Sequence, residues 1–195
     1  MADNKKIGLY FGSFNPIHIG HLIIANHMVN YTDLDEVWLV VSPLNPFKKK
    51  KILLDDFVRL ELVNRAIEGY DKLKVSDIEF GLPRPSYTIN TLVYITEKYP
   101  KKDFVLIMGS DNLNSFYMWK NHEFILQNYE LYVYPRMTST KRSLDSHKKI
   151  NLVGAPIIQI SSSFIRSAIK DKKDIRAMLP ENVWEYIDDM NFYRK

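Results

Sequence analysis

The chain of 195 residues contains no cysteine, so it has neither a disulfide framework nor a thiolate metal site. No apolar run approaches the ~20 residues that a membrane-spanning helix requires. The first residues, 1–6, lead directly into an apolar run and do not have the form of a signal peptide. We find no internal repeat and no low-complexity segment. These absences predict a cytoplasmic protein that does not associate with a membrane.

The net charge of +4 is small, and much of it comes from residues 48–51 and 141–149. A basic excess favours anionic partners such as nucleotides, but most lysine runs are solvated faces, so we predict no nucleic-acid partner from charge alone. Hydrophobic residues make up 46% and charged residues 26% of the chain, which are ordinary values for a globular protein. The length fits one domain, and we assign residues 1–195 to it.

Short apolar runs alternate with helical patterns along most of the chain, which predicts βαβ units and a Rossmann-like, doubly wound parallel sheet of the α/β class. The predicted strands are 7–11, 37–41, 73–78, 104–108, 131–134 and 157–160. Predicted helices begin near residue 18, at Asp55, at Ser86 or Thr88, near Asn121 and at 164. A helical tail follows from about residue 161, with Val183, Trp184 and Ile187 on one face in its last part.

Three finer expectations concern single segments. The helix after Asp55 should bury Phe57, Leu60, Val63 and Ile67. Residues 109–112 should be a loop, and the polar, basic segment 135–151 should be another. In parallel sheets, ligands bind beyond the carboxyl ends of the strands. The loops at those ends are 12–21, 42–51, 109–112 and 161–166, which contain the unusual polar stretches of the chain.

The loop 12–21 is the most informative of these. Gly12 allows a close backbone approach, and Ser13 and Asn15 are turn formers. His18 and His21 are three residues apart at a helix start, so they share a face near the positive end of the helix dipole, a position that suits a phosphate. Taken alone, such a histidine pair is more often a capping or packing feature.

Residues 161–166 form a second candidate phosphate site. Ser161, Ser162 and Ser163 offer hydroxyls and free amides at a helix start, and Arg166 adds a fixed cation. The alternative is an ordinary helix cap with a surface arginine. Trp119, by the same reasoning, could stack on a flat ring or could be a core aromatic.

Together these motifs resemble the nucleotidyltransferase superfamily, and within it the bacterial nicotinate-nucleotide adenylyltransferases. Residues 18–21 match H-x-G-H and residues 160–166 match I-S-S-T/S-x-I-R. Residues 86–92 match S-Y-T-x-x-T-L, and Gly109, Asp111 and Trp119 match G-x-D-x-L...F...W. The four motifs occur in the family's order over most of the chain. Phe11, Asn15 and Phe47 stand where the family usually has Gly, Asp and His.

The resemblance implies transfer of AMP from ATP to nicotinate mononucleotide, with release of pyrophosphate. It implies catalytic roles for His18, His21, Lys48 and Arg166. For ATP it implies contacts from Gly12, Ser13, Phe14, His18, His21, Gly109, Asp111, Ser161, Ser162, Ser163 and Arg166. For the mononucleotide it implies contacts from Ser13, Phe14, Lys48, Tyr87, Thr88 and Trp119.

The chemistry of the residues agrees with this reaction. No Ser–His–Asp or Cys–His set indicates a covalent intermediate. No paired carboxylates accompany the motifs, so we expect no protein-bound metal, and Mg²⁺ bound only through the ATP phosphates. A phosphopantetheine adenylyltransferase or cytidylyltransferase, or a non-catalytic nucleotide-binding module, is the alternative. A homo-oligomer is possible on the sequence.

Overall fold

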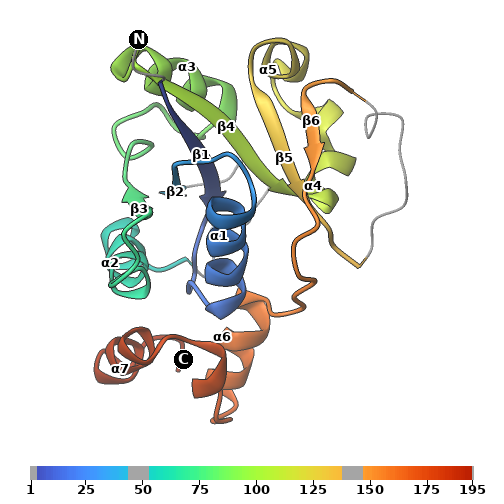
Figure 1. Cartoon of the computed structure of the whole chain (residues 1–195). Coiled ribbons are helices and arrows are strands. Elements are labelled where there is room, and N and C mark those ends of the chain that lie inside the picture. The colour runs from blue at the N-terminus through green and yellow to red at the C-terminus, as the bar shows by residue number, and fades with distance from the viewer. Residues whose placement is uncertain (1–3, 44–52, 138–146, 195) are drawn as a thin grey trace.

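The computed structural model describes residues 4–43, 53–137 and 147–194. A six-stranded sheet lies at its centre, with strand order β3-β2-β1-β4-β5-β6 (Figure 1). Every neighbouring pair is parallel. The strands are β1 (Lys5–Gly12), β2 (Glu36–Val41), β3 (Leu73–Ser76), β4 (Lys102–Gly109), β5 (Glu130–Tyr134) and β6 (Ile150–Leu152). The predicted doubly wound α/β fold is confirmed.

Helices cover both faces of the sheet because alternate residues of each strand point to opposite sides. Tyr10 packs in the core on the side of α1, α2, α6 and α7, whereas Leu9 packs in the core on the side of α3. The helices are α1 (Ile19–Tyr31), α2 (Asp56–Ala66), α3 (Thr88–Lys98), α4 (Ser110–Asn114), α5 (His122–Asn128), α6 (Ser162–Lys170) and α7 (Glu181–Asp189). Short 3₁₀ turns occupy Phe116–Met118 and Arg176–Met178.

The helix caps are partly as predicted. Asp55 caps α2, and its carboxylate accepts a hydrogen bond from the Phe57 amide at 2.9 Å. The cap of α3 is Tyr87, not Ser86 or Thr88, and its side chain makes no capping hydrogen bond. Thr88 is instead the first residue of α3.

Two expectations about the sheet edge are wrong. Residues 157–160 form no strand, and the last described strand is β6, which overlaps the end of the segment 135–151 that was expected to be a loop. β6 has three residues, too few for a pattern of alternation to show in the sequence. Burial alternates along residues 157–160, because Ile158 and Ile160 face the region of His18 while Ile157 is 56% exposed.

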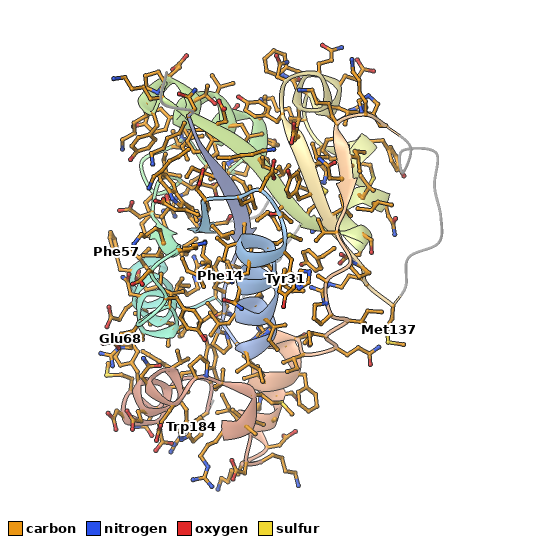
Figure 2. All side chains as sticks on the ribbon, in the orientation of Figure 1. Phe14, Tyr31, Phe57, Glu68, Met137 and Trp184 are labelled. Carbon is orange, nitrogen blue, oxygen red and sulfur yellow. The ribbon has the colours of Figure 1, made fainter. Side chains whose placement is uncertain are left out.

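Two further expectations fail because tertiary contacts override the local pattern. Residues 110–112 are helical: α4 begins directly after β4, and its Leu113 is buried. On α2, Phe57 is 67% exposed and lies on the outer side of the helix (Figure 2). Arg59 is fully buried there instead, since it has polar partners in the loops beneath α2.

The C-terminal helices pack against the rest of the molecule. The Val183 and Ile187 side chains of α7 are buried, as predicted, and Trp184 packs at the edge of the same core. The Asn182 amide group donates a hydrogen bond of 2.6 Å to the Arg65 carbonyl of α2. None of the helices in the described ranges is both long enough and apolar enough to span a membrane.

Candidate active site

Residues 12–21, which connect β1 to α1, are called the histidine loop below. Phe14 has a φ of +41°, and its ring turns back over Gly12. A Cβ at Gly12 would lie 2.7 Å from the Phe14 ring. The Phe14 side chain is buried in the interior (Figure 2). The missing side chain at Gly12 therefore makes room for Phe14, and at these two positions only the backbone is left to meet the predicted phosphate.

His18 and His21 lie together at the start of α1. Their rings stack with centroids 3.7 Å apart and planes inclined by 25°. His18 is the N-cap, and its amide donates a hydrogen bond of 3.2 Å to Nδ1 of His21. A neutral His21 ring therefore carries its proton on Nε2. The hydrogen bond between His18 and His21 thus caps α1, as in the alternative interpretation of the histidine pair. It also leaves the Nε2–H of His21 pointing away from the cap.

The His18 ring is uncharged at neutral pH. Burial, and then the positive charge of Arg136, lower the pKa of His18 to about 4. The side chain is almost completely buried, and its Nδ1 has no hydrogen-bond partner within residues 4–43, 53–137 and 147–194. A buried polar atom of this kind costs free energy until a ligand or water pairs with it. This is the position where the sequence predicts a phosphate group.

Gly20 lies against Ile158. A Cβ at position 20 would lie 2.9 Å from Cγ2 of Ile158 and 3.0 Å from Nδ1 of His18. The absence of a side chain at Gly20 is therefore needed for Ile158 to pack on the backbone there. The remaining concavity beside His18 and Ile158 measures only about 10 Å³. A nucleotide base could enter beside Gly20 only if Ile158 moved.

Arg136, which follows β5, brings a charge to the same place. Its amide donates a hydrogen bond of 2.8 Å to the Ser110 hydroxyl at the start of α4. Its Nε lies 3.9 Å from Oδ1 of Asp111. Asp111 folds over Gly109, where a Cβ would lie 2.4 Å from Oδ1 of Asp111. Arg136 therefore links the predicted residues Gly109 and Asp111 to the region of His18. The sequence analysis did not identify Arg136 as a site residue.

The start of α6 clamps the histidine loop. The Ser161 hydroxyl accepts a hydrogen bond of 3.2 Å from the Phe164 amide, so Ser161 is the cap. The Ser162 hydroxyl donates to the Pro16 carbonyl at 2.9 Å, and Nη1 of Arg166 donates to the Asn15 carbonyl at 2.7 Å. The structure therefore brings the two sequence signatures together across 146 to 151 residues of chain.

Arg59 of α2 holds the histidine loop from the other side. Its Nη1 donates to the Ser13 carbonyl at 2.6 Å and to the Ser42 carbonyl at 2.9 Å. Its Nη2 lies 2.5 Å from Oδ1 of Asp56. The loops after β1 and β2 are thus joined by one buried guanidinium, whose fork of donors fits several carbonyls at once.

A large cavity of about 600 Å³ opens on the opposite face of β1. Phe11 lines it, whereas the preceding residue, Tyr10, faces the histidines. Tyr87, Thr88 and Trp119, predicted from two separate motifs, all line this large cavity. The Nζ atom of Lys120 lies 4.6 Å from the centre of the Tyr87 ring at the same cavity.

The chain matches one family model and is similar in sequence to several known proteins. The family model described as cytidylyltransferase-like matches residues 9–168. A protein of Christiangramia forsetii is 61% identical over 98% of this chain and its own full length. One of Flavobacterium psychrophilum is 60% identical over 97% of this chain and its own full length. Both bear the name "Probable nicotinate-nucleotide adenylyltransferase".

The chain belongs to the nicotinate-nucleotide adenylyltransferase family.

A solved structure with low sequence identity to this chain has the same fold. The nicotinic acid mononucleotide adenylyltransferase of Plasmodium falciparum, complexed with NaAD, superposes with a TM-score of 0.82 at 22% identity. The match covers 97% of each chain. The same TM-score is found for the complex of that protein with APC.

In this adenylyltransferase the predicted site residues fall into two groups on the two faces of β1. His18, His21, Gly109, Asp111 and Arg166 gather around the histidine loop. Tyr87, Thr88 and Trp119 gather in the large cavity. Lys48, and the departure at Phe47, lie outside the described residues. Ser163 is exposed, with its hydroxyl 3.2 Å from that of Ser161.

The site also contains residues that sequence reasoning missed. Arg136 lies two residues after the end of β5, and this position beyond a strand end is a weak signal that sequence reasoning could have used. Glu79 and Arg59 gave no signal, because both lie in stretches that look like ordinary solvated surface. Within the described ranges, no group of three or more histidine or carboxylate side chains gathers into a metal site.

Proposed function

We propose that this chain transfers the adenylyl group of ATP to nicotinate mononucleotide, giving nicotinate adenine dinucleotide and pyrophosphate, in the cytoplasm. The observation that carries the proposal is the placement of two sites on opposite faces of β1. The histidines lie on one face and the large cavity on the other, and the histidine loop runs between them. Two nucleotides could therefore meet with their phosphates at the loop. The names of the close relatives support the same reaction.

The reaction needs positioning and charge stabilisation more than proton transfer. A phosphate oxygen of the mononucleotide attacks the α-phosphorus of ATP, a new P–O bond forms, and the bond to the β-phosphate bridging oxygen breaks. The attacking group is already an anion at neutral pH, since the second pKa of a phosphate monoester is about 6. No base has to activate it, and catalysis rests on donors aimed at the developing charge.

His21 supplies such a donor. Its Nδ1 accepts from the His18 amide, so the ring proton sits on Nε2, and we assign that N–H to the transferring phosphoryl group. His18 is uncharged and offers a single ring N–H, which limits it to a neutral hydrogen-bond role. Arg136 lines the same concavity as the two histidines and Arg166 contacts the histidine loop, and we assign both cations to the phosphates of ATP.

Mg²⁺ would enter on the ATP phosphates, because the described residues present no carboxylate cluster to hold it. Bound there, it neutralises phosphate charge. The chain's own task is then to grip the phosphates through N–H groups of the histidine loop and of the first turn of α6.

The large cavity would take the mononucleotide. The first turn of α3 begins at Thr88, and helix geometry leaves the amides of Thr88 and Ile89 without an intrahelical acceptor, whereas the Asn90 amide donates to the Tyr87 carbonyl at 2.9 Å. Such donors suit the carboxylate of a nicotinate ring. Trp119, half-buried at the same cavity, offers a face for the ring to stack on.

Pyrophosphate release from ATP tests the function directly. Nicotinate mononucleotide, nicotinamide mononucleotide and phosphopantetheine are compared as acceptors under identical conditions. We expect nicotinate mononucleotide to be preferred over the amide by roughly tenfold or more, and phosphopantetheine to be inactive. Turnover of phosphopantetheine, or none with either pyridine mononucleotide, would contradict the proposal.

A further inference from the structure

Glu79 presents a buried carboxyl group to the large cavity. The residue is 1% exposed and lies in the turn that follows β3. Its Oε1 accepts a hydrogen bond of 2.6 Å from the hydroxyl of Thr91, which is fully buried on α3. Its Oε2 is buried and has no partner with full hydrogen-bond geometry in the described part of the chain, although Ser42 lies near enough to act on the carboxyl. Glu79 lines the large cavity, so this oxygen is a candidate contact for a ligand there.

The surroundings of Glu79 disfavour its charged form. Burial raises the pKa of this carboxyl, and the hydroxyls of Thr91 and Ser42 offset the rise only in part. No salt bridge involves Glu79 within residues 4–43, 53–137 and 147–194. Tyr87 and Lys120 are the other titratable side chains lining the cavity there, and Lys120 lies over the Tyr87 ring.

Glu79 is also hydrogen-bonded to α3, the helix that we assign to binding the acceptor. Thr91 lies three residues after Thr88, within the first turn of α3. The Glu79–Thr91 hydrogen bond therefore holds the carboxyl beside the start of α3, where the amides point outward. Thr88 and Glu79 line the same cavity.

We propose that Glu79 helps to select the acid acceptor by binding it in its own protonated form. The neutral carboxyl donates its Oε2–H to the carboxylate of the nicotinate ring. This inference rests on the proposed function, because it assumes that the ring enters the large cavity.

The selection follows from the donors that each acceptor can use. A carboxylate only accepts hydrogen bonds, so it pairs with a protonated Glu79 and with the α3 amides together. An ionised Glu79 would repel the acid at the same position. Binding of the acid is therefore coupled to the protonation of Glu79, whereas binding of the amide is coupled far less.

The test compares wild type with Glu79→Gln for both pyridine mononucleotides, by kcat/KM across a range of pH. In wild type, kcat/KM for the acid divided by kcat/KM for the amide should fall as pH rises through the Glu79 pKa. Both acceptors carry the same phosphate, so the titration of that phosphate cancels in the ratio. Glutamine keeps an N–H donor and an oxygen for Thr91, so the variant should keep its preference for the acid within about threefold. Its ratio should no longer depend on pH.

Calorimetric titration gives a second readout without catalysis. Titrations of each mononucleotide into the protein, in two buffers of different ionisation enthalpy, measure the protons taken up. Wild type should take up more protons with the acid than with the amide, and Glu79→Gln should remove the difference. Equal uptake for the two acceptors in wild type would overturn the proposal.

Other outcomes are equally decisive. Equal weakening of both acceptors in Glu79→Gln would show an ionised carboxylate acting on the ring cation, and overturn protonation. A ratio shifted further toward the acid would show that charge repulsion acts in wild type, and it would overturn protonation as well. Glu97→Gln is the matched control, since it makes the same change at an exposed carboxyl of α3, and it should keep a pH-dependent ratio. Failure of the proposed function is distinct: neither pyridine mononucleotide would then bind or react in wild type.

Discussion

His18 and His21 stack at the start of α1, and their different burial separates their roles. His18 is 4% exposed and beside Arg136, so its ring stays neutral. His21 is half-buried, and the His18 amide fixes which of its ring nitrogens carries the proton. The H-x-G-H spacing placed both rings on one face, but only the packing around them distinguishes the two.

The first prediction at this scale concerns His21. His21→Ala should lower kcat by at least ~100-fold, because its Nε2–H acts as charge develops on the phosphoryl group. ATP binding should weaken only modestly, as measured by titration. His27→Ala, on the same helix, is the control and should keep normal turnover. Near-normal turnover in a folded His21→Ala protein would remove His21 from the mechanism.

A second prediction concerns pH and His18. Its pKa of about 4 lies below the ordinary 6.5, so the unfolded chain binds the proton first as pH falls. The stability from the neutral ring is fully present above pH ~6.5 and is lost toward pH 4. Between pH 7 and 5, wild type should lose about 2 kcal/mol more unfolding free energy than His18→Gln. Denaturant titrations at both pH values measure this, and equal losses would contradict it.

At the scale of elements, α2 and α6 hold the histidine loop from two sides. Arg59 of α2 joins the loop to the segment after β2, and Arg166 of α6 holds the Asn15 carbonyl. Both helices were predicted at nearly correct positions. Their inward-facing arginines decide how rigid the loop is, because each guanidinium satisfies carbonyls that lie far away in the sequence.

Arg59→Ala should destabilise the fold strongly. The carbonyls of Ser13 and Ser42 lose a buried donor, and Asp56 keeps only Arg84. The free energy of unfolding should drop by about 3 kcal/mol or more. Arg176→Ala, in which an exposed pair with Asp174 is lost, is the control and should change the free energy little. Equal effects of the two substitutions in denaturant titration would show that the hydrogen bonds of Arg59 to the two loops do not stabilise the fold.

Arg166→Ala separates two roles of one side chain. If Arg166 binds ATP phosphates as proposed, the Kd of ATP should rise more than that of the mononucleotide, by roughly tenfold or more. If Arg166 only holds Asn15, both affinities should fall alike. Separate titrations of the two substrates decide, and Lys170→Ala at the far end of α6 serves as control.

At the scale of the whole molecule, the C-terminal tail reaches the histidine loop. The Tyr193 hydroxyl donates a hydrogen bond of 2.7 Å to Oδ1 of Asn15, across 178 residues. The Leu54 amide donates to the same oxygen at 3.2 Å. Asn15, buried within the loop, is thus held by Leu54, just before α2, and by Tyr193, near the C-terminus. This gives the asparagine at this position a structural role that turn chemistry alone did not show.

Tyr193→Phe tests that link. Asn15 keeps the Leu54 amide as a donor, so the free energy of unfolding should fall by about 1 kcal/mol. Turnover should fall several-fold as the loop loosens, and pyrophosphate release measures it. Tyr31→Phe is the control, because Tyr31 is 74% exposed. Unchanged stability and turnover in Tyr193→Phe would show that the tail does not support the site.

The sequence alone determined the order of most elements and the edge of the sheet where the site lies. Apolar periodicity is a local property, so the buried strands and the helices α1, α2, α3 and α6 could be predicted from it. Turn residues and polar loops at strand ends marked the histidine loop in the same way. The motifs at 86–92 and 109–119 placed Tyr87, Thr88 and Trp119 in one site, and the large cavity brings them together.

Only the tertiary structure decided which distant polar groups meet. Arg59, Arg136, Glu79 and Tyr193 look like surface residues in sequence, and each is placed at the site by contacts far along the chain. The three-residue strand β6 forms because it pairs with the edge of β5. Ile158 lies outside the sheet and packs on Gly20. The physical reason is the same throughout: burial of an apolar face is signalled locally, whereas the partner of a buried polar group depends on the packed chain.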